Sequence, residues 1–477
     1  MRRRTLSRMT VAACALTLLA GIAPAATASA DRSGDRPSDS STTGDADRTE
    51  GHQRPAFRSV GYFTQWGVYG RDFQVKDLDT SGTAARLTHV NYAFGNVSAD
   101  GKCFTGNVPG QSDAWADYAR PLDAAGSVDG VADTDTQPLA GNFNQLRELK
   151  AKHPGLKAMI SLGGWSWSTH FSDAARTAAS RKALVSSCVD LYIKGNLPVD
   201  GARGGAGAAA GLFDGIDIDW EWPGSEGNAG TVFRPEDKKN FTALVHEFRK
   251  QLDAYARTSA KATKADEGKG KGHGHTPRPR HYELSAYVPT SPAKIDAGFD
   301  VPRIMRDFDF VNLQGYDFHV SGEKTTAQQS ALYAKGDHSV DQTVRDWIRR
   351  GAPARKLVVG MPFYGQGWTG VTGGGDGLGQ PAAAPAPATY AAGYEDYKAL
   401  KKLAASGTYA LHRDTRNGHA WLFDGTTLWT YDDPQVLRTK AKYVRDRGLG
   451  GAMFWSLDGD TENGELITAV DRGLNRR

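Results

Sequence analysis

Short runs of apolar and β-branched residues recur along the chain from about residue 57, and each run ends in polar, glycine or aromatic residues. Segments with apolar residues at helical spacing separate most of these runs, as at 142–153, 238–257 and 341–351. This alternation predicts parallel β-strands joined by helical crossovers. The eight predicted strands are 58–66, 87–94, 156–165, 212–222, 282–288, 308–317, 355–365 and 448–458.

Eight such strands in roughly 420 residues favour an α/β fold, a (β/α)8 TIM barrel with insertions. An open doubly wound sheet is the weaker alternative, because no phosphate-type glycine fingerprint follows the first strand. Residues 366–428 lie between the seventh and eighth strands and contain turns and alternating apolar runs. They predict a small α+β subdomain inserted into the barrel.

Residues 258–281 differ from the rest in being low-complexity, basic and rich in glycine, histidine and proline. We expect a mobile loop between a helix and the fifth strand. Its histidines, His273, His275 and His281, are of a metal-ligating type, but a solvated loop is the preferred interpretation.

The N-terminus is typical of exported proteins. In residues 1–30, four arginines precede an apolar run too short to span a bilayer stably, and a small-residue cleavage site follows. Residues 31–54 are almost entirely polar and predict a disordered linker, which leaves 55–477 for the barrel. Since no second long apolar run follows, we expect a soluble, secreted protein.

Charge and cysteine content place only weak limits on the possible partners and on the presence of a disulfide. Four of the 58 basic residues lie in the predicted signal, so 54 remain against 54 acidic residues. This balance gives no reason to expect a nucleic-acid or membrane partner. Cys103 and Cys188 remain after the signal, and the sequence is compatible with either one disulfide or two buried thiols.

The stretch FDGIDIDWEWPG, at 213–224, carries four acidic residues within eight positions. Alternate side chains of a strand face opposite sides, so Asp217, Asp219 and Glu221 share one face, with neighbouring Cα atoms roughly 6.6 Å apart. The apolar residues between them suit the helix side of a barrel strand, which leaves the acids in the barrel interior. Asp214 has the wrong parity and is expected to be structural, at the start of the strand.

Three buried carboxylates repel one another and lose hydration, so at least one should keep its proton near neutral pH. Glu221 comes last, at the C-terminal mouth where barrel active sites lie, and is the candidate general acid. A divalent-metal site is a weaker alternative, because metal carboxylates usually come from several elements. A purely structural cluster is weaker still, because buried acids without a role are costly. We therefore expect no metal and no cofactor.

The motif DGIDIDWE resembles the Asp-x-x-Asp-x-Asp-x-Glu signature of family 18 glycoside hydrolases, the chitinases. Companion motifs follow in the family's order on strands three, six, seven and eight. They are SLGGW at 161–165, QGYD at 314–317, GMPFYGQGW at 360–368 and the tryptophan at 455.

The resemblance extends from about Val60 to Leu457, and the insertion before the eighth strand resembles that of the bacterial subfamily with deep clefts. Two residues depart from the family pattern: Gln314 replaces the usual Met, and Gln366 replaces the usual Arg. Neither touches the carboxylate strand, so the departures should alter subsite preference rather than activity.

Because Asp219 and Glu221 share a strand face, they cannot easily flank a sugar on both sides. The resemblance implies a retaining, substrate-assisted reaction, in which the 2-acetamido oxygen attacks the anomeric carbon. Glu221 would protonate the leaving oxygen and later activate water. Asp219 would hydrogen-bond the acetamido N–H, and Asp217 would share a proton with Asp219. Tyr316 would contact the acetamido oxygen, and Trp455 would form the apolar floor.

The expected substrate-binding residues are Gly163, Gly164, Trp165, Ser166, Trp222, Gln314, Gly315, Tyr316, Asp317, Trp455, Tyr62 and Phe94. Tyr62 and Phe94 are expected to line the pocket floor, and plain barrel core is their alternative. Trp66, Trp167 and Trp368 also lie near predicted strand ends. They could extend an aromatic platform or simply pack in the core.

The expected function is therefore a secreted, monomeric chitinase that cleaves β-1,4 bonds between N-acetylglucosamine units of chitin or chito-oligosaccharides, with endo action favoured. One alternative is an endo-β-N-acetylglucosaminidase acting on glycoprotein N-glycan cores. Another is a chitin-binding lectin, which is less favoured because such lectins lose the terminal Glu of the motif, and Glu221 is present.

Overall fold

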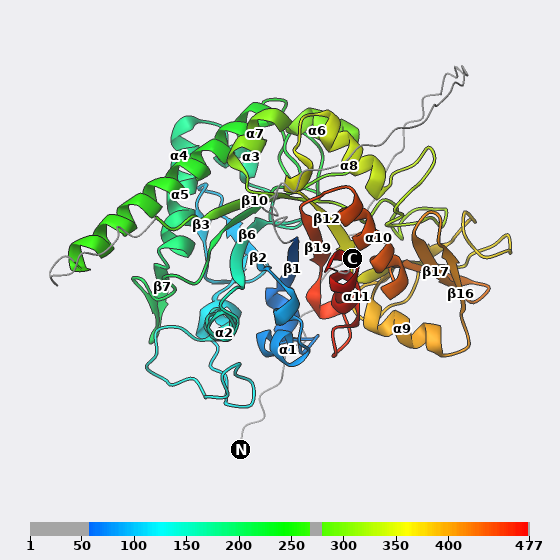
Figure 1. The fold of residues 1–477 in the computed structure, drawn as a ribbon, viewed down its shortest axis with the longest axis horizontal. Helices are drawn as coiled ribbons and strands as arrows, with labels where there is room; N and C mark the ends of the chain where they lie inside the picture. The colour runs from blue at the N-terminus through cyan, green and yellow to red at the C-terminus, as the bar shows by residue number, and fades with distance from the viewer. Residues whose placement is uncertain (1–56, 268–278, 476–477) are drawn as a thin grey trace, which may run out of the picture. The chain divides into compact units, whose positions relative to one another are not determined.

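A closed barrel of eight parallel strands forms the centre of the protein (Figure 1). The computed structural model describes residues 57–267 and 279–475, so the predicted signal peptide and linker lie outside the described residues. The strands are β1 (Arg58–Thr64), β2 (His89–Val97), β6 (Lys157–Gly163), β9 (Gly215–Asp219), β10 (Glu283–Val288), β11 (Val311–Leu313), β12 (Leu357–Pro362) and β19 (Gly451–Trp455). Their order is β1-β19-β12-β11-β10-β9-β6-β2, and pairing of β1 with β2 closes the barrel. The predicted α/β barrel is confirmed.

Helices surround this barrel, and their inward faces bury apolar residues against the strands. The longer ones are α2 (Gly141–Lys152), α4 (Ala178–Cys188), α5 (Asp237–Glu267), α8 (Val340–Arg349), α10 (Pro434–Asp446) and α11 (Glu465–Asn475). The shorter ones are α1 (Val75–Thr80), α3 (Phe171–Ala174), α6 (Pro292–Gly298), α7 (Val301–Asp307) and α9 (Tyr397–Ala405). No helix in the described ranges is both long enough and apolar enough to cross a membrane.

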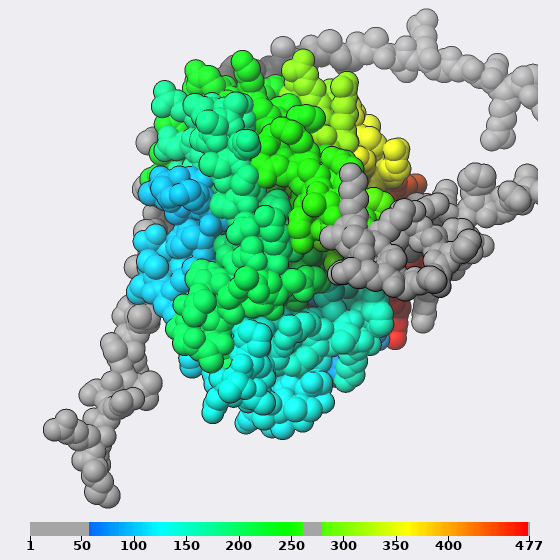
Figure 2. All heavy atoms as spheres, turned by 90° about the vertical axis from the view of Figure 1, so that its left-hand side faces the viewer, coloured from blue at the N-terminus to red at the C-terminus, as the bar shows by residue number. Residues whose placement is uncertain are grey.

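The helix α5 is longer than the sequence pattern predicts. It continues through Glu267, so residues 258–267 are helical rather than part of a loop. The reason is composition: this part is rich in alanine, lysine and acidic residues, which are good helix formers. Of the three histidines, His273 and His275 lie outside the described residues, whereas His281 bonds Asp309 at 2.7 Å. Figure 2 views the side on which the green segments, including α5, cover the barrel.

The long connection between β12 and β19 forms the α+β insertion. Its antiparallel sheet has the order β14-β13-β18-β17-β16, with β15 paired to β13, and it carries α9. The strands are β13 (Tyr364–Thr369), β14 (Ala384–Pro385), β15 (Tyr394–Asp396), β16 (Ala410–Asp414), β17 (His419–Phe423) and β18 (Thr427–Tyr431). A fully buried pair of Lys440 and Asp432 joins this sheet to α10. In Figure 1 the insertion lies on the side opposite the end of α5.

The connection between β2 and α2 carries several small elements. They are β3 (Cys103–Phe104), β4 (Asn107–Val108), β5 (Ser112–Asp113) and the short helix η3 (Trp115–Ala119). A further hairpin, β7 (Leu197–Asp200) with β8 (Arg203–Gly205), lies between α4 and β9.

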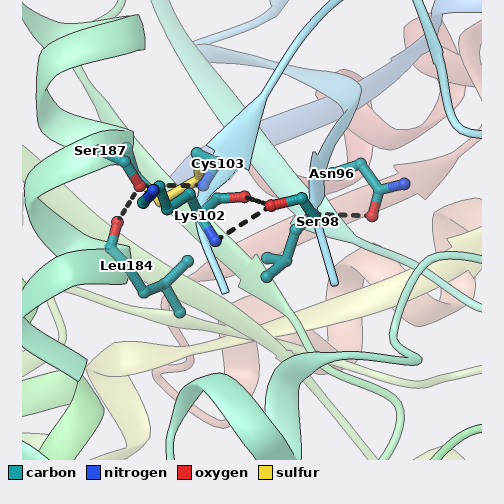
Figure 3. Close-up of a disulfide and its surroundings, with 8 residues drawn as sticks. Asn96, Ser98, Lys102, Cys103, Leu184 and Ser187 are labelled. Carbon is teal, nitrogen blue, oxygen red and sulfur yellow. Dashed lines mark hydrogen bonds between the residues drawn. A yellow bond between two sulfur atoms is a disulfide. The ribbon is translucent and has the colours of Figure 1, made fainter. Parts of the chain in front are cut away.

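A disulfide between Cys103 and Cys188 settles the choice that the sequence leaves open, and it joins β3 to the end of α4 across 85 residues (Figure 3). The neighbouring Ser187 Oγ accepts a hydrogen bond from the Cys103 N–H at 2.9 Å and donates to the Leu184 carbonyl at 2.7 Å. Closing a loop of this length typically stabilises a fold by about 2–4 kcal/mol. The disulfide therefore fixes the β2–α2 connection to the helix ring.

Candidate active site

The acidic residues of β9 line the barrel interior as strand parity predicts. Asp217, Asp219 and Glu221 are 0%, 4% and 9% exposed, respectively. On the opposite face, Trp220 stacks on Phe171 of α3 with ring centroids 5.5 Å apart. The apolar face thus anchors the strand to the helices, and the acids rise along the interior to the C-terminal mouth.

Asp214 lies at the start of this strand, away from the row of acids. Its Oδ2 accepts hydrogen bonds from Lys150 Nζ at 2.6 Å and from the Ala158 N–H at 2.8 Å, and Arg280 also contacts it. These contacts hold the start of β9 against its neighbours, which is a structural placement.

Asp217, the deepest acid, is surrounded by donors from four other strands. Its Oδ2 accepts from Tyr62 Oη at 2.7 Å and Ser161 Oγ at 2.8 Å. Its Oδ1 accepts from Ser285 Oγ at 2.5 Å and Asn312 Nδ2 at 3.4 Å. Burial raises the pKa of Asp217, and these hydrogen bonds oppose that rise by stabilising the ionised form.

Asp219 is not among these partners. The structure shows no hydrogen bond between the Asp217 and Asp219 side chains, so the predicted sharing of a proton stays a prediction. The Oδ1 atom of Asp219 is buried and has no hydrogen-bond partner in the structure. Burial, and then the negative charges of Glu221 and Asp217, raise its pKa well above the ordinary range. A buried carboxylate oxygen with an unused acceptor is suited to a donor on a ligand.

The glycines before Trp165 bring β6 close to β9. A side chain at Gly163 would place its Cβ 2.3 Å from the Asp219 carbonyl oxygen, and one at Gly164 would meet the Phe94 ring at 2.6 Å. The Gly164 N–H donates to that Asp219 carbonyl at 2.8 Å. Both glycines are therefore required, Gly163 by the close approach of the two backbones and Gly164 by the Phe94 ring.

Glu221 follows β9 at the mouth. Burial raises its pKa to about 8, the positive charge of Lys294 lowers it, and the negative charge of Asp317 raises it. Lys294, on α6, lies over the Trp222 ring with Nζ 5.2 Å from the centroid. The negative charges of Glu221 and Asp219 oppose each other's ionisation, so the pair holds a proton near neutral pH. Glu221 is the member at the mouth, where a leaving group can reach it.

Asp317 adds a half-buried carboxyl to the site. Tyr364 Oη and Gln366 Nε2 donate to its Oδ1 at 2.6 and 2.9 Å, respectively. Its φ of 54° is the left-handed conformation that a non-glycine residue rarely adopts, and such strain is concentrated at functional sites. The unusual Gln366 therefore contacts a site residue directly, as an uncharged donor.

Aromatic rings form one wall of the pocket beside β1 and β19. The Trp455 ring lies 5.3 Å from Tyr62, 5.7 Å from Phe94 and 6.5 Å from Trp66, measured between centroids. Tyr62 is buried and donates to Asp217, whereas Trp66 is 42% exposed. Tyr62 is thus the buried ring of this group, Phe94 and Trp455 are half-buried, and Trp66 is exposed.

A second aromatic wall was not predicted as a unit. It runs from Trp222 to Tyr287 and Tyr316, then to Tyr364 and Tyr394, with consecutive centroids 5.6, 6.2, 6.0 and 4.2 Å apart. The insertion contributes Tyr394, so it adds a ring to this row rather than merely extending from the barrel. In the run YELSAYV, Tyr287 is two positions after Ser285 and so lies on the same face of the strand. This parity is a signal that could have identified it.

The remaining predicted residues are spread around the mouth. Trp165 is 38% exposed and Ser166 is exposed, so both belong to the rim. Gly315 approaches the Gly360 carbonyl, where a Cβ would lie only 2.0 Å away. Gln314 uses its Oε1 to accept a hydrogen bond from the Thr290 N–H at 3.3 Å. Trp368 is fully buried and is core.

Within residues 57–267 and 279–475, no cluster of three or more histidine, cysteine or acidic side chains is arranged to hold a metal ion. The site combines two buried carboxyls that share a proton by mutual repulsion, an unpartnered oxygen on Asp219 and two groups of aromatic rings. This arrangement suits acid–base chemistry on a neutral ligand with apolar faces and N–H donors.

Comparisons with known proteins agree with this chemistry. The model of the family "Glycosyl hydrolases family 18" matches residues 58–460. Chitinase 63 of Streptomyces plicatus is 39% identical over 445 residues, and Chitinase C of Streptomyces lividans is 40% identical over 417. These matches cover 91% and 85% of this chain but only 63% and 58% of the two relatives, so the chain spans about three fifths of their length. The catalytic domain of psychrophilic chitinase B from Arthrobacter TAD20 has a TM-score of 0.81 and 46% identity, covering 88% of this chain and 96% of that one.

Proposed function

The chain belongs to glycosyl hydrolase family 18, and from that premise we propose that it is a chitinase. The proposed reaction is hydrolysis of β-1,4 bonds between N-acetylglucosamine units of chitin or chito-oligosaccharides, with retention of anomeric configuration. The observation that carries the proposal is the row of acids on β9, which ends in a buried Glu221 whose pKa is raised to about 8.

In the first proposed step, Glu221 donates its proton to the glycosidic oxygen as the bond from that oxygen to the anomeric carbon breaks. The carbonyl oxygen of the sugar's own acetamido group forms the new bond to the anomeric carbon, which gives a cyclic oxazolinium ion. The unpartnered oxygen of Asp219 supports this role, because the acetamido N–H requires a buried acceptor. Tyr316, whose Oη lies 3.9 Å from Met453 Sδ, is the proposed donor to the acetamido oxygen.

In the second proposed step, the Glu221 carboxylate takes a proton from a water molecule whose oxygen attacks the anomeric carbon. The oxazolinium ring opens, the acetamido group is restored, and Glu221 is again protonated. Trp455 lies beneath the proposed sugar position, where its ring suits the apolar face of N-acetylglucosamine. The reaction as proposed uses no metal and no cofactor.

The insertion, the N-terminus and two unusual glutamines bear on substrate shape, location and subsite preference. The wall formed by Tyr394 of the insertion supports a groove for a linear polymer. We infer that the protein acts as a secreted monomer, and the inference of secretion rests on the N-terminal sequence alone. We also infer that Gln314 and Gln366 change subsite preference rather than the chemistry.

Removal of Lys294 should move the pH dependence in a defined direction. The acid form of Glu221 is required, so kcat/KM should fall as the pH rises through the pKa of about 8. Lys294 lowers that pKa, so Lys294→Met should raise it and shift the alkaline limb of the pH profile to higher pH. The exposed Lys239→Met serves as the control and should leave the limb in place. A limb that is unchanged, or lower, in Lys294→Met would contradict the role of Lys294.

The choice of substrate is tested by offering two that share the same linkage. The wild-type protein should hydrolyse N-acetylchitohexaose, and NMR of the first product should show the β anomer at the new reducing end. A glycopeptide carrying the N,N′-diacetylchitobiose core should remain intact. Cleavage of the glycopeptide alone would instead support an endo-β-N-acetylglucosaminidase, and binding without cleavage of either would support a lectin.

A further inference from the structure

Asp117 is a buried carboxyl outside the proposed catalytic machinery. It lies on the short helix η3 (Trp115–Ala119) and is 4% exposed. Its Oδ1 accepts hydrogen bonds from Gln65 Nε2 and, at 2.7 Å, from Tyr92 Oη, and its Oδ2 accepts from Thr105 Oγ1 at 2.9 Å. Three separate segments of the chain therefore converge on one carboxyl through uncharged donors.

Gln65 connects this carboxyl to the pocket, because Trp66 follows it directly. The main-chain oxygen of Gln65 accepts from Asn142 Nδ2 at 3.4 Å, so the residue is held by its side chain and by its backbone. The Trp66 ring, 42% exposed, lies 6.1 Å from Phe94 and 6.5 Å from Trp455. Asp117 thus holds the segment that presents the outermost ring of the first aromatic wall.

No basic side chain among the described residues pairs with Asp117. The titratable groups around it are Tyr92 on β2, Asp113 on β5, Tyr118 on η3, Tyr192 beyond α4 and Tyr69 after η1 (Gln65–Val68). Arg120, which follows η3, is bonded to Gln74 at 2.6 Å. Burial raises the pKa of Asp117 to about 7, the three hydrogen bonds lower it, and the charge of Asp113 raises it.

We propose that Asp117 is a positioning residue for saccharide binding, which holds Trp66 in place through Gln65 when its carboxyl is ionised. This inference rests on the proposed function, because it takes the ligand of Trp66 to be a chito-oligosaccharide. An ionised carboxyl accepts from all three donors, whereas a protonated one must itself donate. Protonation leaves Oδ1 able to accept from Gln65 but removes the negative charge, so the contact that fixes Trp66 loses its charge assistance and weakens.

Saccharide affinity should decrease as the pH falls, because the ionised carboxyl of Asp117 is the form that holds Gln65 and Trp66. As the pH falls through about 7, Asp117 gains a proton, and binding that depends on Trp66 weakens. Since a hydrogen bond to a charged group exceeds a neutral one by roughly one kilocalorie per mole, the affinity should fall by about threefold to tenfold.

The test is a double-mutant cycle in the Glu221→Gln background, which prevents turnover and removes the titration of Glu221. The dissociation constant of N-acetylchitohexaose is measured at pH 8.5 for four proteins: the parent, Asp117→Asn, Trp66→Ala and the combination of the two changes. Asp117→Asn should weaken binding about threefold to tenfold when Trp66 is present and should have no effect when it is absent. A cost that is equal in both backgrounds would overturn the proposal.

Two further variants distinguish an effect of Asp117 on the position of Trp66 from an effect on the stability of the whole fold. Gln65→Met cuts the link while Asp117 remains, so it should reproduce the loss of affinity and abolish its pH dependence. Glu283→Gln changes a paired acid at the opposite end of the barrel, where Glu283 bonds His89 at 2.6 Å. That control should lower the unfolding temperature without changing the dissociation constant or its pH dependence.

Iodide quenching of fluorescence provides a readout that needs no saccharide. The signal of Trp66, obtained as the difference between the parent protein and Trp66→Phe, should become more accessible below about pH 7 only when Asp117 is present. If the hexamer does not bind the Glu221→Gln protein at all, the proposed function fails, and the quenching experiment still decides the inference. Accessibility that does not change with pH would overturn it.

Discussion

The Glu221→Gln variant should hydrolyse chito-oligosaccharides at least about 100-fold more slowly than the wild type, because general acid–base catalysis typically contributes that factor or more. The amide has nearly the same shape as the carboxyl, so the pocket and its affinity for the ligand should be preserved. The change removes both proposed functions of Glu221, the proton for the leaving oxygen and the base for water.

The measurement is kcat on N-acetylchitohexaose together with the dissociation constant of the same oligosaccharide. Glu236→Gln is the matched control, because Glu236 is an exposed residue between β9 and α5 and has no part in the proposed reaction. Its rate should equal that of the wild type. An unimpaired Glu221→Gln protein would eliminate the proposed mechanism, and an inactive wild type would eliminate the proposed function.

The second large effect should come from Asp219→Asn, which removes a charge while it leaves an acceptor oxygen in place. We expect a loss of about 100-fold to 1,000-fold in kcat, as observed when one preorganised electrostatic contact to a transition state is removed. The lost contact is the stabilisation of positive charge that spreads over the acetamido group as the oxazolinium ion forms.

The pH profile of the residual activity distinguishes this cause from simple misfolding. A negative charge on Asp219 opposes ionisation of Glu221, so its removal should lower the pKa of Glu221 and move the alkaline limb to lower pH. Asp214→Asn, at the start of the same strand, should lower thermal stability but keep the limb in place, since Asp214 faces Lys150 rather than the pocket. The absence of any shift in Asp219→Asn would argue against the coupled pair.

Local sequence patterns were sufficient to predict the barrel and the row of acids. Each of the eight predicted runs overlaps one barrel strand, because a buried strand has a compact apolar signature with polar ends. The second run, 87–94, ends too early, because β2 continues to Val97. The period-two alternation in 213–224 placed Asp217, Asp219 and Glu221 on one face, and their low exposure agrees with that placement.

The parts that sequence reasoning missed depend on register between strands. The wall from Tyr287 to Tyr394 joins separate segments, and only their spatial order brings the rings together. Lys294 lies on a seven-residue helix with no distinctive pattern, yet its charge acts on Glu221. Likewise, nothing in the sequence WADYA marks Asp117, whose three partners are 12 to 52 residues away along the chain.

The disulfide between Cys103 and Cys188 has a consequence for proteolysis. The ring it closes contains the β2–α2 connection, much of which is exposed between residues 121 and 137, and such segments are preferred sites of cleavage. A single cut there leaves both fragments covalently joined, and β1, β2, β6 and β9 stay hydrogen-bonded within one sheet. A molecule nicked in this connection can therefore keep its barrel closed and its acids in place.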